Sequence, residues 1–172
     1  FEVNDFMPRY YHAKKLMFHP PDIIRYIKLI SGEPEFSLLY DPKLVYAKGK
    51  THTVIEDNYI KSYTEKIAYE SIYLYSDLNL AKIINKKSFK LKSDCFLLLS
   101  YNKKIIHPDL DNIYLQFEKT KVYWLEWVSN TNKFPDFNDI ILRSALVLKL
   151  LSYDKSGAII AAATTSLPES IG

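Results

Sequence analysis

The sequence predicts a mainly β protein, an antiparallel β-sandwich that is followed by two helices. Three observations predict this class. Tyr and Phe, which favour the pleated and half-buried surface of strands, occur fourteen and nine times. Short apolar runs separated by turn residues fill residues 23–101, a spacing typical of antiparallel sandwiches. From Asp109 onward the apolar residues recur instead at helical spacing.

The first predicted strand is the most ambiguous one. Residues 23–30 fit helical spacing about as well as strand alternation, but their β-branched content and the boundaries at Pro20-Pro21 and Gly32 favour a strand. Residues 36–40 alternate and end at Asp41-Pro42, which is a turn signal.

The later strands are predicted from turn signals and from one continuous apolar run. Residues 51–55 and 59–63 flank a polar tripeptide and predict a hairpin. Residues 71–75 and 88–91 follow as short strands. Residues 95–101 are apolar without interruption, as expected for a strand that is buried on both faces.

Two helices are predicted after the strands. Asp111 is the predicted cap of a helix that ends near Ser129. Its two sides differ: Ile113, Phe117, Trp124 and Val128 lie on one, and Lys119 and Lys121 on the other. After a polar loop, a second helix begins near Asp136 or Asn138 and ends near Ser152. Because this helix is apolar nearly all round, we expect it to be buried by polypeptide outside this chain.

Composition limits the classes of partner. The net charge of +3 comes from scattered lysine pairs and not from a basic block, so we expect no nucleic-acid partner. No apolar run is long enough to predict a membrane partner. Cys95 is the only cysteine, which excludes an intrachain disulfide and fits either a reducing compartment or disulfide-free secretion. Of these we expect a cytoplasmic location.

A search for chemistry finds no catalytic residue, metal site or cofactor. The four histidines are far apart in the sequence, and the four glycines are too dispersed for a phosphate-binding loop. No nucleophile-elbow motif is present. Acidic residues form three pairs, but pairs in turns are commonly solvated or cap helices, and we assign no catalytic role to them: Glu56/Asp57, Glu65/Glu70 and Asp109/Asp111.

The last thirty residues resemble a known enzyme family. Residues 143–151, 157–159 and 161–169 resemble the start of the catalytic domain of glycoside hydrolase family 15, the glucoamylase-like and trehalase-like enzymes, although Ala163 stands where the family usually has Pro. Further matches are collinear with this one: Asp5-Phe6-Met7-Pro8, Ser31-Gly32-Glu33, Tyr40-Asp41-Pro42 with Tyr46, residues 96–101 as the last sandwich strand, and Tyr123-Trp124 with Trp127 in a linker helix.

The resemblance implies three parts and one reaction. Residues 1–108 would form a supersandwich that lacks its first strands, residues 109–135 a helical linker, and residues 136–172 the first helix of an incomplete (α/α)6 barrel. Family members hydrolyse α-glucosidic bonds with inversion, on an α-glucan, a maltooligosaccharide or trehalose. Their catalytic glutamates and sugar-binding segments lie beyond Gly172. Within the chain, the resemblance implies a supporting role near the pocket for Thr164, Thr165 and Glu169.

Two other functions are weighed against this one. The abundant Tyr residues fit a stand-alone carbohydrate-binding or interaction module, because aromatic faces stack on sugars. Weak enzymatic activity of the chain itself has no motif to support it. The sequence therefore favours a non-catalytic part of a glycoside hydrolase.

Overall fold

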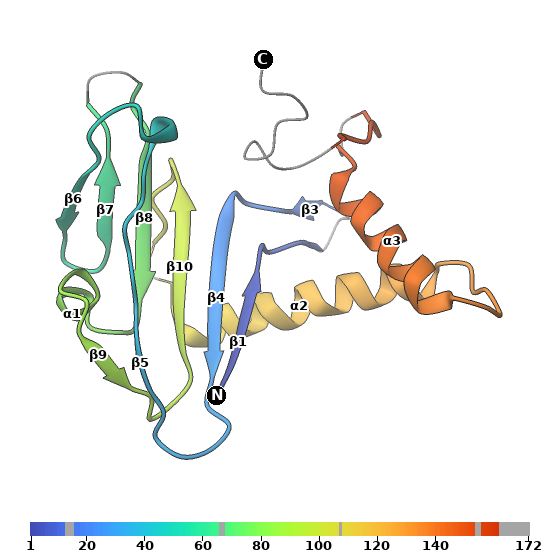
Figure 1. Cartoon of the computed structure of the whole chain (residues 1–172), viewed down its shortest axis with the longest axis horizontal. Helices are drawn as coiled ribbons and strands as arrows, with labels where there is room; N and C mark the ends of the chain where they lie inside the picture. The colour runs from blue at the N-terminus through green and yellow to red at the C-terminus, as the bar shows by residue number, and fades with distance from the viewer. Residues whose placement is uncertain (13–15, 66–67, 107, 154–155, 162–172) are drawn as a thin grey trace. The chain divides into compact units, whose positions relative to one another are not determined.

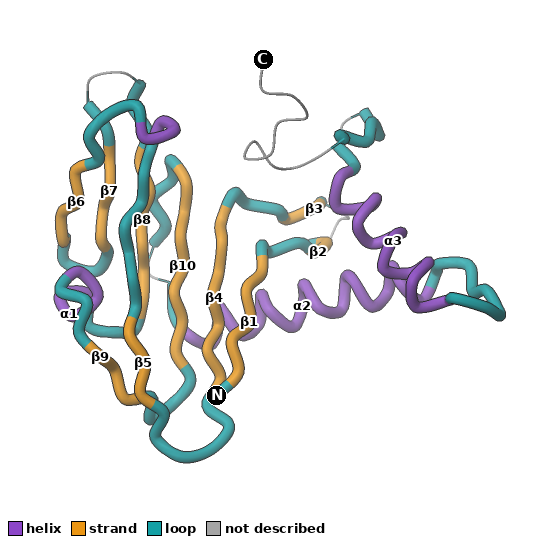
Figure 2. The backbone as a smooth tube through the Cα atoms, in the orientation of Figure 1, coloured by secondary structure: helices purple, strands orange, loops and turns teal. Residues whose placement is uncertain are grey.

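A computed structural model describes residues 1–12, 16–65, 68–106, 108–153 and 156–161, and it confirms the mainly β class (Figure 2). The strands are β1 (Glu2–Phe6), β2 (Tyr10–Tyr11), β3 (Met17–Phe18), β4 (Asp22–Lys28), β5 (Glu35–Ser37), β6 (His52–Ile55), β7 (Ile60–Tyr63), β8 (Ser71–Ser76), β9 (Ser88–Lys90) and β10 (Cys95–Tyr101). The helices are α1 (Leu80–Ile84), α2 (Leu110–Ser129) and α3 (Asn138–Leu151), with a 3-10 turn η1 (Val45–Ala47).

Six of the strands form one antiparallel sheet, in the order β1-β4-β10-β8-β7-β6 (Figure 1). β10 lies between β4 and β8, with Leu98 opposite Ile24 on one side and Tyr75 on the other. The strand prediction for residues 23–30 is therefore confirmed by β4. The predicted hairpin is confirmed by the pairing of β6 with β7, in which Ile55 lies opposite Ile60.

One face of this sheet packs against the first turns of α2. The buried cluster on that face joins Ile24 and Tyr26 of β4 to Phe96 and Leu98 of β10 and to Ile113 of α2. Ile113 is fully buried. Side chains alternate along a strand, so the residues between these ones point to the other face.

The other face packs against a small second layer, the two-stranded pair β5–β9 together with α1. Phe36 of β5 lies opposite Phe89 of β9 and their rings stack with centroids 5.7 Å apart. Two clusters fill the space between the layers, one around Leu74 and Ile83 and one around Ile27 and Cys95. Strands therefore lie in two layers, as in a sandwich, and the second layer contributes two strands among the described residues.

The sequence missed several short elements. β1 was not predicted as a strand, and neither was the β2–β3 pair. Asn79 caps the unpredicted helix α1 by accepting a hydrogen bond from the Lys82 N–H (2.9 Å), which is the usual role of Asn at a helix N-terminus. β5 ends at Ser37, before Tyr40, so the predicted strand at residues 36–40 is shorter than expected.

The predicted cap of α2 was wrong by two residues. Asp109, and not Asp111, accepts the hydrogen bond from the Asn112 N–H (2.8 Å), while Asp111 lies in the first turn, where its charge favours the helix dipole. The buried side of α2 also includes Thr120 and Tyr123, and Lys119 and Lys121 are exposed as predicted.

Contacts divide the chain into two compact units, Phe1–Tyr123 and Trp124–Gly172, with the division inside α2. In the second unit, α3 confirms the predicted second helix, and none of its residues is buried. Ile140 and Leu150 are each about two-thirds exposed. In the described part of the chain, no helix combines the length and hydropathy that a membrane span requires.

The contact of Ile113 with the sheet gives the first prediction. Ile113→Ala should lower the free energy of unfolding by about 2–5 kcal/mol, because it opens a cavity in a fully buried cluster. Urea unfolding followed by circular dichroism measures the change. Leu115→Ala, on the same helix but about half exposed, is the matched control and should change stability by less than about 1 kcal/mol. Equal losses in the two variants would contradict the packing described.

Candidate functional site

The three predicted supporting residues, Thr164, Thr165 and Glu169, lie outside the described residues. Within the described residues, no group of three or more His, Cys, Asp or Glu side chains is placed to hold a metal ion. Two of the three described histidines pack against aromatic rings: His52 stacks on the ring of Tyr63, and His12 lies edge-on to Tyr10. His19, the third, is exposed.

Cys95 is a core residue and not a nucleophile. It is buried at the start of β10, in the cluster with Ile27 and Leu91. Burial, reinforced by the charges of Asp77 and Asp94, raises the pKa of its thiol to about 12. A thiol with so high a pKa carries almost no thiolate at neutral pH, so this position cannot serve nucleophilic catalysis.

The acidic pairs do not form a catalytic pair of carboxyl groups. Glu70 accepts hydrogen bonds from the Val45 N–H (2.8 Å) and the Tyr101 hydroxyl (3.0 Å), and so it ties η1 to β10. Asp109 caps α2. Glu56 and Asp57 are exposed in the β6–β7 turn. These four carboxyl groups thus have a structural role or a solvated position.

Two further carboxyl groups, which sequence reasoning did not single out, hold β10 in place. Asp94 accepts hydrogen bonds from the Leu29 N–H (2.9 Å) and the Tyr26 hydroxyl. Asp77 accepts one from the Phe96 N–H (3.0 Å). Burial raises the pKa of Asp77, although its bond to Phe96 opposes the rise. Through these hydrogen bonds to backbone N–H groups, Asp94 fixes the end of β4 and Asp77 fixes the start of β10.

Asp22 differs from these carboxyl groups because one of its oxygens is unsatisfied. Asp22 of β4 lies opposite Ser100 of β10, with 5% and 0% of their surfaces exposed. Asp22 Oδ1 and Ser100 Oγ are buried without a hydrogen-bond partner among the described residues. Burial raises the pKa of Asp22, while the hydroxyl of Ser100 and the charge of Lys103 oppose the rise.

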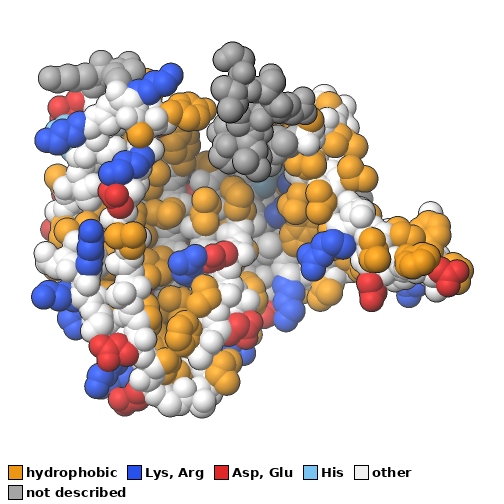
Figure 3. Space-filling view, in the orientation of Figure 1, with side chains coloured by type: hydrophobic (Ala, Val, Ile, Leu, Met, Phe, Trp, Pro, Cys, Tyr) orange, Lys and Arg blue, Asp and Glu red, His pale blue; other side chains and the backbone are white. Residues whose placement is uncertain are grey.

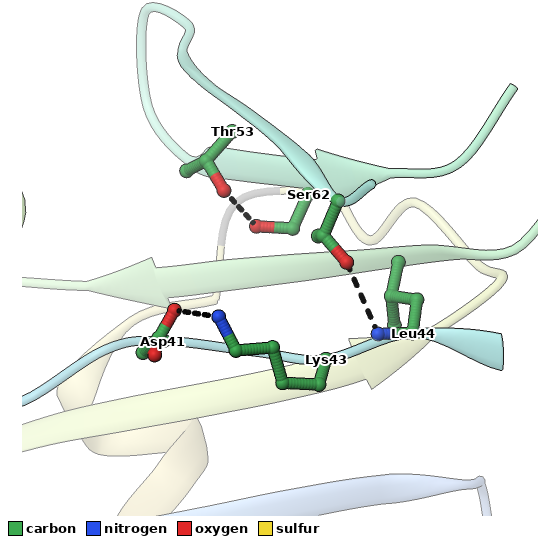
Figure 4. A network of polar contacts seen from close by, with 6 residues as sticks. Asp41, Lys43, Leu44, Thr53 and Ser62 are labelled. Atoms are coloured by element: carbon green, nitrogen blue, oxygen red, sulfur yellow. Dashed lines mark hydrogen bonds and ion pairs between the residues drawn. The ribbon is translucent and has the colours of Figure 1, made fainter. Parts of the chain in front are cut away.

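A polar network joins the segment after β5 to the β6–β7 hairpin (Figure 4). Ser62 is its centre, since its hydroxyl lies 3.0 Å from the Tyr40 hydroxyl and 2.9 Å from the Thr53 hydroxyl. The Leu44 N–H donates to Thr51 Oγ1 (3.1 Å). These hydroxyls satisfy one another next to the sheet, and none is placed beside a base that would activate it.

Two cavities among the described residues differ in size and in the side chains that line them. One, of ≈ 460 Å³, lies between the β6–β7 turn and the segment before α2, and its lining residues are Asp57, Asn58, Lys104, Ile105 and Ile106. It has one carboxyl group and no aromatic ring, whereas hydrolysis of a glycosidic bond needs two carboxyl groups. The other, of ≈ 190 Å³, is mostly apolar and lies on β4 and β10.

The segments that carry the family resemblance have structural positions. Asp5 forms an ion pair with Arg25 on the neighbouring strand, and Pro8 is fully buried. Tyr123 is buried in α2, where its hydroxyl accepts a hydrogen bond from Arg9 Nε (3.1 Å). These residues therefore contribute an ion pair, a buried proline and a buried hydrogen bond to the fold.

The fold is that of a mainly β domain, and the described residues do not assemble a catalytic site. The chain is similar to proteins named trehalase. It is 28% identical to one from Thermoplasma volcanium over 99% of this chain and 27% of that protein, and 28% identical to one from Thermoplasma acidophilum over 99% of this chain and 29% of that protein. A trehalase from Mycobacterium tuberculosis is 29% identical over 86% of this chain and 23% of that protein.

These matches relate nearly the whole chain to trehalase-named proteins, and the chain spans about a quarter of the length of these relatives. No family model matches the chain. No solved structure matches it.

The buried Asp22 gives a prediction of pH dependence. Its pKa in the folded state is raised above the ordinary value of 3.8, so the folded chain retains a proton that the unfolded chain releases. Stability is therefore lost as the pH rises above 3.8 toward the raised pKa. Asp22→Asn removes this loss. The urea midpoint of the variant, minus that of the unmodified chain, should therefore increase as the pH rises from 3 to 7.

Asp57→Asn, in the exposed turn, is the matched control, and its difference from the unmodified chain should not change with pH. Parallel pH profiles for Asp22→Asn and the unmodified chain would show that Asp22 ionises as easily in the folded chain as in the unfolded one.

Proposed function

We propose that this chain is the N-terminal, non-catalytic part of an inverting glycoside hydrolase that acts on α-glucosidic bonds and belongs to the glucoamylase- and trehalase-like family 15. The observation that carries the proposal is the similarity of nearly the whole chain to proteins named trehalase, each of which is far longer than the chain. The assignment to family 15 and to an inverting reaction rests on the resemblance of the segments from Asp5 to residue 169.

The described chemistry supports a scaffold role in such an enzyme. The carboxyl groups of Glu70, Asp77, Asp94 and Asp109 accept hydrogen bonds from backbone N–H groups, so each serves the fold. A general acid and a general base would have to lie across a sugar from one another. In this proposal both belong to polypeptide downstream of Gly172, and Thr164, Thr165 and Glu169 support the pocket that they line.

The proposal divides the chain by role. Residues 1–108 form the sandwich domain, which lacks its first strands, residues 109–135 link it to the catalytic domain, and residues 136–172 begin an (α/α)6 barrel. The apolar and unburied α3 supports this assignment, because a helix of that kind needs neighbouring helices to cover it. Trehalose is the proposed substrate, with maltooligosaccharides and α-glucans as members of the same substrate class.

The cytoplasm is the proposed compartment. The one cysteine, Cys95, is a free thiol in the core, which fits a reducing environment.

The proposal is tested by comparing this chain with a longer form that continues past Gly172. Proton NMR follows the anomers that are released from trehalose and maltose. We expect the longer form to cleave at least one of them and this chain to cleave neither. Because inversion changes only the attacked anomeric centre, trehalose should give equal initial amounts of β- and α-glucose, and the non-reducing unit of maltose should appear first as β-glucose. Hydrolysis by this chain alone, or a longer form that cleaves no α-glucoside, would contradict the proposal.

Titration calorimetry of this chain with trehalose, maltose and soluble starch separates the proposal from a stand-alone carbohydrate-binding module. A scaffold domain should give no binding heat at millimolar sugar. A saturable isotherm would favour the module instead.

A further inference from the structure

The turn η1 has a backbone conformation that its own sequence does not favour. Its three residues are consecutive and left-handed, with φ angles of 49° for Val45, 53° for Tyr46 and 59° for Ala47. Residues other than Gly and Asn rarely adopt this region, and a β-branched residue such as Val45 is an outlier there. Because η1 contains neither Gly nor Asn, contacts with the rest of the fold must impose its conformation.

The side chains of η1 are not buried enough to offset this strain. Tyr46 is 79% exposed, Ala47 is exposed and Val45 is half-buried, while Leu44, immediately before the turn, is buried. In Figure 1, η1 is the short teal coil at the top of the sheet, between β5 and β6 in the chain. Figure 3 has the same orientation and shows hydrophobic side chains at the surface of this end of the sheet. The turn is therefore held mainly by hydrogen bonds.

Glu70, directly before β8, accepts the strongest of these hydrogen bonds. Its Oε2 accepts from the Val45 N–H (2.8 Å), and its Oε1 accepts from the Tyr101 hydroxyl at the end of β10 (3.0 Å). The Leu44 N–H donates to the neutral hydroxyl of Thr51 (3.1 Å). A carboxylate acceptor makes a hydrogen bond roughly twice as strong as a neutral acceptor does. The bond from Val45 to Glu70 therefore opposes most of the strain.

The backbone of Glu70 is fixed independently of η1. The Glu70 N–H donates to Oγ1 of the buried Thr64 (3.1 Å), and the Thr64 N–H donates to the Glu70 carbonyl (3.1 Å). The next residue, Ser71, donates its N–H to Asn102 Oδ1 (2.7 Å). Strained residues persist only where the surrounding structure over-determines them, and a fixed acceptor meets that condition.

We propose that η1 and Glu70 form a conformational latch, a two-state element in which the carboxylate of Glu70 holds the left-handed turn closed against its backbone preference. When the bond between Val45 and Glu70 breaks, the three residues of η1 relax to negative φ angles while the sheet stays folded. This opening moves the exposed ring of Tyr46 and leaves one oxygen of Glu70 without its backbone donor. The inference goes beyond the proposed function and does not depend on it.

Amide hydrogen exchange of the full chain, resolved by residue with NMR, tests the latch. The amides of Val45 and Ala47 should exchange through local opening, at rates that low urea concentrations do not change, whereas exchange at Leu98 in β10 should rise with urea. Glu70→Gln removes the charged acceptor and should speed exchange at Val45 and Ala47 at least about tenfold. Glu65→Gln, at an exposed position before β8, is the matched control and should leave these rates unchanged.

Ala47→Gly makes the test specific to backbone strain. Gly accepts the left-handed region, so this substitution should slow exchange at the Val45 amide about threefold, and it should reverse part of the effect of Glu70→Gln when the two are combined. It leaves the hydrogen bonds of the turn in place, so it tests the latch in a folded chain. Ala81→Gly, in the right-handed helix α1, is the control and should speed exchange in α1 without changing η1.

Three results would each overturn the proposal. The first is exchange at Val45 that is as slow and as dependent on urea as exchange at Leu98. The second is a Glu70→Gln variant whose η1 amides exchange like those of the unmodified chain. The third is an Ala47→Gly variant whose Val45 amide exchanges faster, because that result would show a turn without left-handed strain.

Discussion

β10 is buried on both faces, and the packing of the whole Phe1–Tyr123 unit depends on that burial. Phe96 and Leu98 pack on the α2 side, while Leu97 and Leu99 pack on the side of β5, β9 and α1. Its two neighbours, β4 and β8, supply its hydrogen-bonded ladders. Asp77 and Asp94 fix the N-terminal end of β10, because they accept hydrogen bonds from the backbone N–H groups of Phe96 and Leu29. A substitution that disturbs the packing of β10 would therefore affect both the α2 side and the β5–β9 side of the sheet.

This arrangement explains why the domain offers so little chemistry. The buried thiol of Cys95 is inert, and the carboxyl groups near β10 bind backbone donors. Asp22 and Ser100 are the exceptions, because their buried oxygens lack partners among the described residues. The proposed scaffold role would require rigidity rather than reactive groups, and a strand that is packed on both sides provides rigidity.

The sequence predicted the strands whose pattern reflects burial. The apolar run of β10, the hairpin of β6 and β7, and the long helices followed from periodicity and turn residues. β1 was missed because its outward side carries Val3 and Asp5 while its inward side has Phe6 as the main apolar residue, which is a weak alternation. α1 was missed because five residues are too few for a helical period, although the Asn79 cap was readable.

The candidate site was less predictable for a physical reason. The roles of Asp77, Asp94 and Glu70 depend on hydrogen bonds to residues at least 19 positions away, which no local pattern records. The family resemblance came from segments such as Asp5-Phe6-Met7-Pro8, which the structure uses for packing and for one ion pair. Such segments indicate ancestry more directly than they indicate chemistry.

Hydrogen exchange of the native chain, resolved along the backbone by mass spectrometry, tests the central position of β10 most directly. Amides of residues 95–101 should exchange only through global unfolding and should be the slowest in the chain, with those of β4 and β8 close behind. The unburied α3 should exchange much faster, through local opening. Fast exchange at residues 95–101, at the rate of α3, would contradict the account of a domain built around a strand packed on both faces.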